Sequence, residues 1–320
     1  MNNRFGMVIV TYNRLEKLKT VLERISSQSV APDVVIVFDN HSTDGSDKVL
    51  DEWKAKQKFK TIVHHNDTNL GGSGGFANGL KMMLEEDVDW IYLGDDDAYP
   101  NTDLIEKFKE YVFKHQDEID GISSISTRVD DPMGISFFHR KNIIRGKLKP
   151  VEVFSVPSDY EKEEFEATLF SFVGVILNKT KAIQAGLPRQ EFFIIGDDTE
   201  YALRISKLGK NICVPSLKVL HDSMPILSND IDITWKVYYG YRNMFEIYMT
   251  YFGKSLTGSY MFFKFLKARL KLFKYLITFN KVNFNKQQIF IMMLKDARSD
   301  FKKHKFGISE KYPPGKKFEI

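Results

Sequence analysis

Apolar runs alternate with helical spacing along the first 230 residues of the chain. Continuous apolar runs at residues 6–12, 34–38 and 90–93 predict strands that are covered on both faces, and residues 61–65 predict another strand. Between them, residues 14–28, 46–58 and about 75–86 predict helices, the first because Leu15, Leu18 and Leu22 recur on one helical face. This alternation predicts an α/β fold with a mostly parallel sheet between helices.

The pattern changes twice further along the chain. Residues 128–166 are irregular, with a turn at 130–134, and apolar structure returns at residues 169–177. A helix is predicted at 198–208 and short strands at 211–214 and 217–220. From about residue 231 aromatics and lysines interleave. We therefore predict an α/β domain over residues 1–230 and a basic, aromatic-rich helical region over residues 231–320.

The charges divide at the same point. Residues 1–230 hold 28 Lys and Arg against 36 Asp and Glu, whereas residues 231–320 hold 18 against 6. The basic region has three interpretations: helices packed on the α/β domain with solvated lysines, a contact with an anionic membrane surface, or nucleic-acid binding. We find no DNA- or RNA-binding motif, so no nucleic-acid partner is expected.

The single cysteine, Cys213, excludes an internal disulfide and is typical of a reducing compartment. Residues 1–6 pass directly into the first predicted strand without the pattern of a signal peptide. No stretch approaches 18 uncharged apolar residues, so no membrane span is predicted. We expect a cytoplasmic location, with or without peripheral contact with the inner face of the cell membrane.

Three consecutive acids, Asp95, Asp96 and Asp97, follow the predicted strand at residues 90–93. Adjacent carboxylates at the end of a buried strand repel one another and lose solvation, so they need a strong cation to stay charged together. Mg²⁺ or Mn²⁺ carrying a phosphate suits such hard oxygen ligands. The alternative is a solvated turn after the strand.

Two further polar clusters follow predicted strands. Asp39, at the start of the run 39–46, could accept hydrogen bonds from a ribose or a base, or residues of this run could cap a helix. Residues 69–77 hold four glycines in five positions, and N–H groups at the start of a helix form an anion site. Residues 72–77 also fit the loose GxGxxA pattern, which leaves a nicotinamide-dependent oxidoreductase open.

A second acidic cluster, Asp197, Asp198 and Glu200, opens the predicted helix at residues 198–208. A carboxylate there is stabilised as the anion and could act as a general base, or it could simply cap the helix. His221 follows the predicted strand at residues 217–220 and is either an ordinary histidine or a third metal ligand.

Taken together, these residues resemble the GT-A glycosyltransferases of family 2 over roughly residues 6–225. The matching pieces are residues 10–14, 39–46, 69–72, 95–97, 197–198 and His221. A narrower similarity to bacterial galactofuranosyltransferases rests on residues 69–76, 95–98 and 197–201. Rhamnosyltransferases of the same family remain the alternative.

The resemblance implies a role for each matching residue. Thr11, Asn13, Arg14 and Asp39 would hold the nucleoside, Asn69, Gly71 and Gly72 would approach the nucleotide and sugar, and Asp96 would meet the ribose or donor sugar. Asp95, Asp97 and His221 would bind Mn²⁺ or Mg²⁺, and Asp198 would be the catalytic base. Asp197 and Glu200 would position hydroxyls, and Phe172 stands where the narrower family often has a tryptophan at the acceptor site.

The activity that this implies is inverting, metal-dependent transfer of galactofuranose from UDP-galactofuranose. The acceptor would be a hydroxyl of a growing cell-surface glycan, linked to a lipid such as a polyprenyl diphosphate. The pathway would be the assembly of a cell-envelope polysaccharide. Transfer of rhamnose from dTDP-rhamnose is the alternative, and a third hypothesis is a binding protein that has lost turnover. The complete acidic set, with Asp95–Asp97 and Asp198 present, argues against the third.

Overall fold

The computed structural model describes residues 3–223 and 233–318 and divides into two compact units. Of the described residues, the sheet unit comprises 3–142, 153–190 and 198–223, and the helical unit comprises 143–152, 191–197 and 233–318. The predicted boundary near residue 230 lies outside the described residues.

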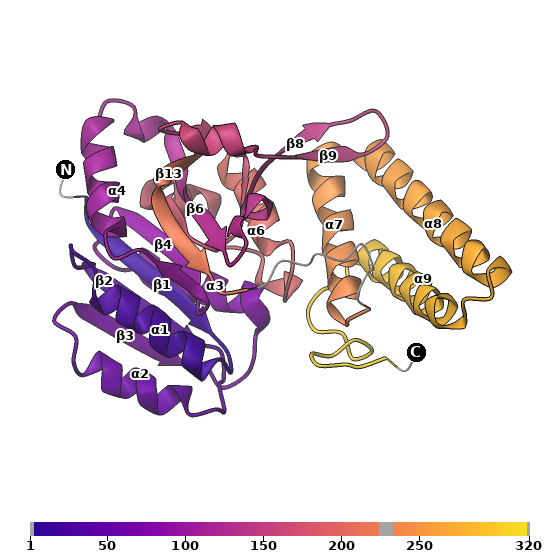
Figure 1. Ribbon diagram of the computed structural model, residues 1–320, viewed down its shortest axis with the longest axis horizontal. Coiled ribbons are helices and arrows are strands. Elements are labelled where there is room, and N and C mark those ends of the chain that lie inside the picture. The colour runs from indigo at the N-terminus through magenta and orange to yellow at the C-terminus, as the bar shows by residue number, and fades with distance from the viewer. Residues whose placement is uncertain (1–2, 224–232, 319–320) are drawn as a thin grey trace. The chain divides into compact units, whose positions relative to one another are not determined.

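The sheet unit is built on one mixed, mostly parallel sheet, as predicted (Figure 1). Its main strands lie in the order β10-β13-β6-β12-β4-β1-β2-β3. Four parallel strands form one side: β1 (Phe5–Thr11), β2 (Val34–Asp39), β3 (Lys60–His65) and β4 (Trp90–Asp95). The others are β6 (Ile122–Asp131), β10 (Phe165–Glu166), β12 (Val175–Asn178) and β13 (Lys210–His221), with β5 (Ala98–Pro100) paired to β13 and β7 (Gly134–Ile135) to β6.

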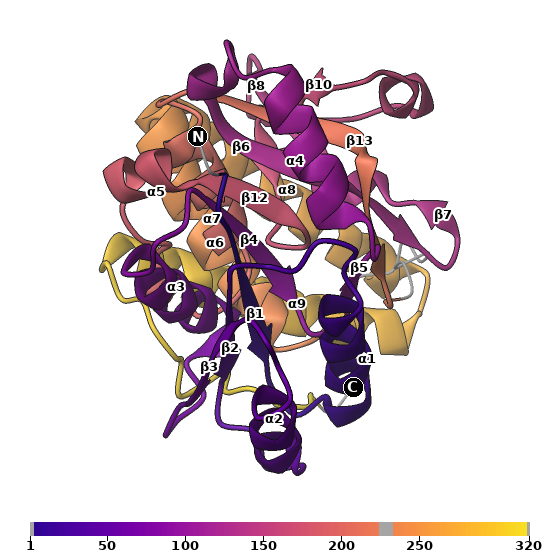
Figure 2. The ribbon, with the colours of Figure 1, turned by 90° about the vertical axis from the view of Figure 1, so that its left-hand side faces the viewer.

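Helices cover both faces of this sheet, which is why the first two strands are buried throughout. Figure 2 shows α3 (Gly71–Leu84) on one side of β1, and α1 (Leu15–Ser26) and α4 (Leu104–Lys114) on the other. Phe5, Met7 and Ile9 of β1 join the core formed with α1, α2 (Ser46–Lys54) and α4. The shorter helices are α5 (Lys179–Ala185), α6 (Asp197–Ile205), η1 (Ile119–Gly121), η2 (Phe137–His139), η3 (Pro157–Glu161) and η4 (Gln190–Phe192).

The prediction that the third helix begins near Gly75 is wrong, because α3 begins at Gly71. A Cβ at Gly75 would lie 2.5 Å from Val10 Cγ1, and a Cβ at Gly79 would lie 2.6 Å from Val8 Cγ1. These glycines therefore let α3 lie close against β1. The close packing offsets the cost of glycine in a helix, which the sequence pattern alone overestimates.

The two short strands predicted at 211–214 and 217–220 form a single strand, β13. Its register against β6 shifts between Val214 and Lys218, where Pro215 lacks the N–H needed for the ladder. The last residue of β13, His221, pairs with Ala98 of β5, and the N–H of Asp222 donates to the carbonyl of Asp97 at 2.8 Å. Helix α4 and most of strand β6 were not predicted.

A second, three-stranded sheet has the order β11-β8-β9, from β11 (Leu169–Phe170), β8 (Arg140–Arg145) and β9 (Pro150–Phe154). Arg140 is fully buried at the start of β8. Its guanidinium donates to the carbonyls of Thr127, Val173 and Gly174 at 2.7–3.0 Å. These bonds join β8 to the segments around β6 and β12.

The helical unit contains α7 (Lys236–Phe252), α8 (Lys254–Ile277) and α9 (Lys281–Lys302), which confirms the predicted helical C-terminal region. An aromatic core that includes Tyr238, Tyr239 and Phe245 packs against residues of α9. Arg242 is 1% exposed, donates to the carbonyls of Gly307 and Phe192, and lies over the Tyr239 ring at 5.0 Å. None of the helices within residues 3–223 and 233–318 has the length and apolar character needed to cross a bilayer.

Candidate active site

The carboxyl ends of β1, β2, β3 and β4 bring polar side chains into one row. The parallel register sets Val10 beside Asp95, Thr11 beside Asp39, and Asp39 beside His65. Ligands of open α/β sheets bind at this edge. The row therefore forms the floor of a candidate active site.

Two of the three consecutive acids are buried against Arg14. Asp96 and Asp97 are 3% and 4% exposed. Thr11 Oγ1 donates to Asp96 Oδ2 at 2.9 Å, and Arg14 Nη1 lies 3.2 Å from Asp96 Oδ1 and 2.5 Å from Asp97 Oδ2. The half-exposed guanidinium of Arg14 therefore supplies the positive charge that the adjacent carboxylates need.

The two carboxyls titrate differently. Burial raises the pKa of Asp96 to about 6, although the charge of Arg14 opposes this. Burial also acts to raise the pKa of Asp97, but a hydrogen bond to His221 and the charges of Arg14 and Lys17 hold it below its usual range. Both groups are thus mainly ionised at neutral pH, and Asp96 gains a proton first as the pH falls.

His221 reaches the acids from the end of β13. Its Nε2 lies 3.5 Å from Asp97 Oδ1, a separation that follows from the pairing of β13 with β5. Lys17 Nζ lies 3.6 Å from Asp97 Oδ2 and 3.5 Å from Asp222 Oδ2. The ring of His139 stands edge-on to His221 at 5.1 Å, and burial together with the charge of Arg140 lowers the pKa of His139 well below its usual value.

The predicted metal ligands are only partly assembled. Within the described residues, no group of three or more His, Cys, Asp or Glu side chains is arranged to hold a metal ion. The donor types nevertheless fit a hard divalent cation, because Asp97 and His221 already converge and Asp95 ends β4. An ion bound here would need further ligands from a bound phosphate and would displace Arg14 from Asp97.

Asp39 is held at the end of β2 by two neighbours. Its Oδ1 accepts from the N–H of Ser42 at 2.9 Å, and its Oδ2 lies 3.0 Å from His65 Nδ1. Burial acts to lower the pKa of His65, but bonds to Asp39 and Asp51 raise it overall. Asn13, with φ of 51°, accepts from the N–H of Thr43 at 2.7 Å. It thereby joins the loop after β1 to the loop after β2.

The start of α3 is organised by two asparagines. Asn69 Oδ1 accepts from the N–H of Gly71 at 2.8 Å and from Asn40 Nδ2 at 3.1 Å. Gly71 has φ of 72°, which favours glycine, whereas a Cβ on Gly72 would meet nothing within 4 Å. Gly72 therefore borders open space at the N-terminus of a helix, where backbone N–H groups favour an anion.

The remaining predicted residues form a second group around the start of α6. Asp198 is half-buried, and its Oδ1 accepts from the N–H of Thr199 at 2.6 Å. Asp197 is buried as the first residue of α6. Glu200 is also buried and pairs with Arg204 at 2.7 Å, and Arg204 donates as well to the carbonyl of Ala185. The observed role of Glu200 is therefore structural, and its acceptor role stays a prediction.

Phe172 lies inside an aromatic cluster. It is 3% exposed, and its ring lies 4.7 Å from Phe76 of α3 and 6.0 Å from Tyr201 of α6. It thus joins these two helices. Little of its surface is available to an acceptor in this arrangement, and its predicted acceptor contact stays a prediction.

Four site neighbours were missed from the sequence: Lys17, Asn40, His65 and His139. His65 ends β3 as Asp39 ends β2, so attention to every strand end would have found it. Lys17 contacts Asp97, and His139 contacts His221, through the packing of distant segments, for which a single sequence carries no signal.

The comparisons with known proteins agree with this geometry. Residues 7–156 match the model described as Glycosyl transferase family 2. Galactofuranosyltransferase GlfT1 of Mycolicibacterium smegmatis is 29% identical over 203 residues, which cover 63% of this chain and 65% of that protein. The match therefore spans slightly less than two thirds of that relative. The predicted resemblance to family 2 and to galactofuranosyltransferases is confirmed.

Solved structures confirm the predicted GT-A fold. A structure of GalNAc-T7 with UDP, GalNAc and Mn²⁺ has a TM-score of 0.57 at 14% identity, covering 75% of this chain and 47% of that one. The mannosyltransferase PcManGT of Pyrobaculum calidifontis, in complex with GDP-Man and Mn²⁺, has a TM-score of 0.54 at 14% identity, covering 94% and 79%. The match of residues 7–156 to the family 2 model, rather than these structures, favours a transferase over the nicotinamide alternative.

Proposed function

We propose that the protein, whose residues 7–156 match the model of glycosyl transferase family 2, is an inverting, metal-dependent glycosyltransferase that uses UDP-galactofuranose. One observation carries the proposal: the buried pair Asp96 and Asp97 meets Arg14 and His221 at the carboxyl edge of a parallel sheet. Such a cluster suits a diphosphate that arrives with a cation.

The donor is proposed to bind across the ends of β1, β2 and β4. Thr11, Asn13, Arg14 and Asp39 are proposed to hold the nucleoside, and Asp96 to accept from a ribose or sugar hydroxyl. Asn69, Gly71 and Gly72 border the nucleotide and sugar. The open space at Gly72 supports this role, because no side chain would stand between the helix start and a phosphate.

Asp95, Asp97 and His221 are the proposed holders of Mn²⁺ or Mg²⁺. An ion held there would supply positive charge to stabilise the leaving diphosphate. Arg14 and Lys17 are proposed to assist, because both lie within 4 Å of Asp97 and at least a third of each side chain is exposed to an incoming phosphate. Their long side chains are free to turn from the carboxylate toward the phosphates.

Asp198 is the proposed general base. It takes the proton from an acceptor hydroxyl, whose oxygen then attacks the anomeric carbon from the face opposite the diphosphate. A single displacement of this kind inverts that carbon. The N–H and hydroxyl of Thr199 donate to Asp198 Oδ1 and fix the orientation of this carboxylate. Asp197, Glu200 and Phe172 are proposed to shape the acceptor side.

The galactofuranosyl donor is supported by the similarity to Galactofuranosyltransferase GlfT1. The proposed acceptor is the hydroxyl of a growing, lipid-linked glycan of the bacterial cell surface, reached from the cytoplasmic side of the membrane. The two regions predicted from the sequence, residues 1–230 and 231–320, are proposed to divide these tasks, the first binding the donor and the second carrying the basic surface.

The proposal is tested by thermal-shift titration with UDP, dTDP, GDP and NAD, each with and without Mn²⁺. We expect stabilisation by UDP that depends on the metal, followed by sugar transfer from UDP-galactofuranose. A preference for dTDP would replace the donor by dTDP-rhamnose. A shift with NAD that ignores the metal would contradict the transferase altogether.

A further inference from the structure

Helix α8 carries two separate apolar faces. One face, which includes Met261, Phe265 and Ala268, packs into the core of the helical unit. The other is a stripe of residues spaced by three or four positions, which places them on one side of the helix. The stripe consists of Phe262, Leu266, Leu270, Phe273 and Ile277.

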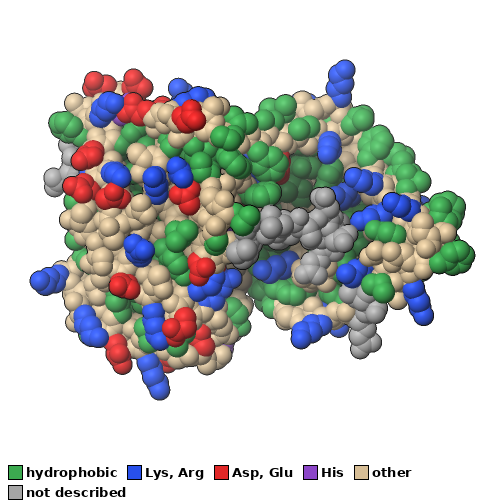
Figure 3. Space-filling model, viewed as in Figure 1, with side chains coloured by type: hydrophobic (Ala, Val, Ile, Leu, Met, Phe, Trp, Pro, Cys, Tyr) green, Lys and Arg blue, Asp and Glu red, His purple; other side chains and the backbone are tan. Residues whose placement is uncertain are grey.

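The stripe is open to solvent along its whole length. Phe262, Leu270 and Phe273 are 62%, 61% and 60% exposed, and Leu266 and Ile277 are also exposed. Figure 3 shows hydrophobic side chains gathered along α8 with lysines and arginines beside them. Contiguous exposed apolar surface of this kind marks an interaction site more often than a plain solvent face.

The charge of the same helix is entirely positive. Helix α8 contains Lys254, Lys264, Lys267, Arg269, Lys271 and Lys274, and no Asp or Glu occurs between Glu246 and Asp296. Two such helices would repel each other, which disfavours a second copy of this chain as the partner. The aliphatic members of the stripe, Leu266, Leu270 and Ile277, disfavour a nucleic acid, because they offer no aromatic face on which a base could stack.

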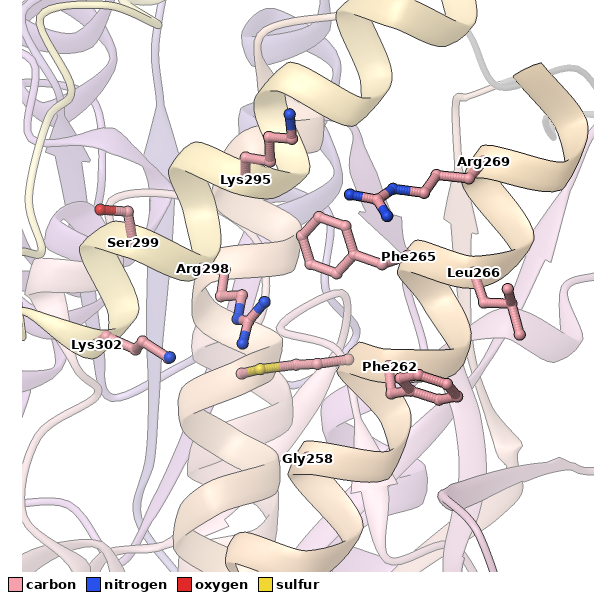
Figure 4. A pocket seen from close by; sticks show the side chains of 10 residues that line it. Gly258, Phe262, Phe265, Leu266, Arg269, Lys295, Arg298, Ser299 and Lys302 are labelled. Atoms are coloured by element: carbon pink, nitrogen blue, oxygen red, sulfur yellow. The ribbon is translucent and has the colours of Figure 1, made fainter. Parts of the chain in front are cut away.

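A cationic groove lies beside this helix, between α8 and α9. Its volume is about 610 Å³, and it is lined by Met261 and Phe265 together with Arg269, Lys295, Arg298 and Lys302. Figure 4 shows Phe265 and Arg269 of α8 and Arg298 of α9 pointing into the space between the two helices. Within the described part of the chain, no carboxylate pairs with Arg269, Lys295 or Lys302. Apolar walls with unpaired cations suit an amphiphile that bears an anionic group.

We infer that α8 lies on the surface of an anionic phospholipid bilayer, with the stripe among the acyl chains and a headgroup phosphate in the groove between α8 and α9. Apolar residues on one face with lysines and arginines around them are typical of interfacial helices. The helix lies in the interface and does not span it, in keeping with its six cationic residues. The inference rests on the helical unit alone and does not depend on the proposed sugar transfer.

The test is flotation of the full chain with vesicles of phosphatidylcholine, with and without phosphatidylglycerol. We expect binding only to the vesicles that contain phosphatidylglycerol. A double variant, Leu270→Gln with Phe273→Gln, should weaken binding about tenfold or more, because it removes two apolar anchors. Arg269→Gln and Lys302→Gln should each weaken it about fivefold, the effect of one cation near an anionic surface.

Phe113→Gln and Lys56→Gln are matched controls in the sheet unit, since Phe113 is 75% exposed and Lys56 is also exposed. Both should bind as the unchanged chain does. Equal binding to both vesicle types, or unchanged binding of the stripe double variant, would overturn the inference. A concentration-dependent dimer that the stripe variant abolishes would overturn it in favour of a second copy. The single cationic variants keep the test decisive if the double variant does not fold.

Discussion

The sheet unit and the helical unit differ in which charged and apolar side chains they bury and which they expose. At the edge of the sheet, Asp96 and Asp97 are buried beside a half-exposed arginine, and the apolar residues of β1 are covered. On α8, the cations are mostly exposed and an entire apolar stripe faces solvent. The sheet unit therefore offers concentrated charge to a small polar ligand, and the helical unit offers apolar area to a large one.

A buried carboxylate and an exposed phenylalanine differ in what they cost the folded protein, so each points to function in a different way. A buried carboxylate has a large desolvation cost, so a protein that keeps two together must provide cations for them. An exposed phenylalanine costs much less, and only the spacing of many such residues along one face is informative. Different evidence thus identifies the two surfaces.

The largest effect is expected from a substitution of Asp198 in the sheet unit. Asp198→Asn should lower the rate of sugar transfer by a factor of about 10²–10⁴, because the general base is lost, while UDP binding stays within about twofold. Initial rates and calorimetric UDP titrations measure the two effects. Asp47→Asn, which removes an exposed acid from the first turn of α2, is the control and should change neither. Full activity of the Asp198 variant would contradict the proposal that Asp198 is the general base.

Arg242 is a buried charge in the core of the helical unit. Arg242→Met should lower the free energy of unfolding by about 3 kcal/mol, because the carbonyls of Gly307 and Phe192 lose their buried donor. Denaturant unfolding measures this loss. Lys254→Met, which removes an exposed cation from the start of α8, is the control and should be nearly neutral. An equally small effect at Arg242 would mean that water replaces the guanidinium.

Alanine substitutions of two glycines in α3 should affect different properties of the sheet unit, one its stability and the other its binding of UDP. Gly75→Ala should lower the free energy of unfolding by about 1–3 kcal/mol, since its Cβ would lie 2.5 Å from Val10. Gly72→Ala should preserve stability or raise it by up to about 1 kcal/mol, but it should weaken UDP binding because a methyl group enters the open space. Thermal unfolding and UDP titrations of both variants measure the contrast. Identical behaviour of the two would contradict it.

The smallest expected effect concerns the pH dependence of donor binding. Because the pKa of Asp96 is about 6, UDP binding should weaken as the pH falls through that value and the carboxylate gains a proton. Thr11→Val removes a hydrogen bond that favours the carboxylate, so the midpoint should move to higher pH by about half a unit. UDP titrations across this range measure the midpoint, with Thr61→Val as control. A midpoint that moves to lower pH would show that Asp96 is not the titrating group.

Much of the sheet could be predicted because strand and helix periodicities differ clearly in residues 5–65. The start of α3 could not be predicted, because a glycine-rich segment is typical of a loop. The close packing on Val8 and Val10 that stabilises this helix is a tertiary effect. The single strand β13 was divided at Pro215 for a similar reason: pairing with β6 continues on both sides of the proline.

The site was predictable to the extent that it follows strand ends. Asp39, Asp95–Asp97 and His221 were found because each ends a strand or comes directly after one. The contact between Asp39 and His65 depends on the register of β2 and β3, and the contact of Lys17 with Asp97 depends on the placement of α1. Neither is encoded in local spacing, so both emerged only from the structure.

The antiparallel pair of β5 and β13 also has a consequence for the order of folding. Tyr99 and Asp222, which hydrogen-bond beside this pair, are separated by 123 residues. Contacts of such long range close late, after local elements have formed. As the chain leaves the ribosome, β1–β4 can therefore present their acids while Arg14 and Lys17 are the nearby cations, and His221 joins only when β13 has been made and docked. The site is therefore complete only after the last steps in the folding of the sheet unit, when His221 joins the acids.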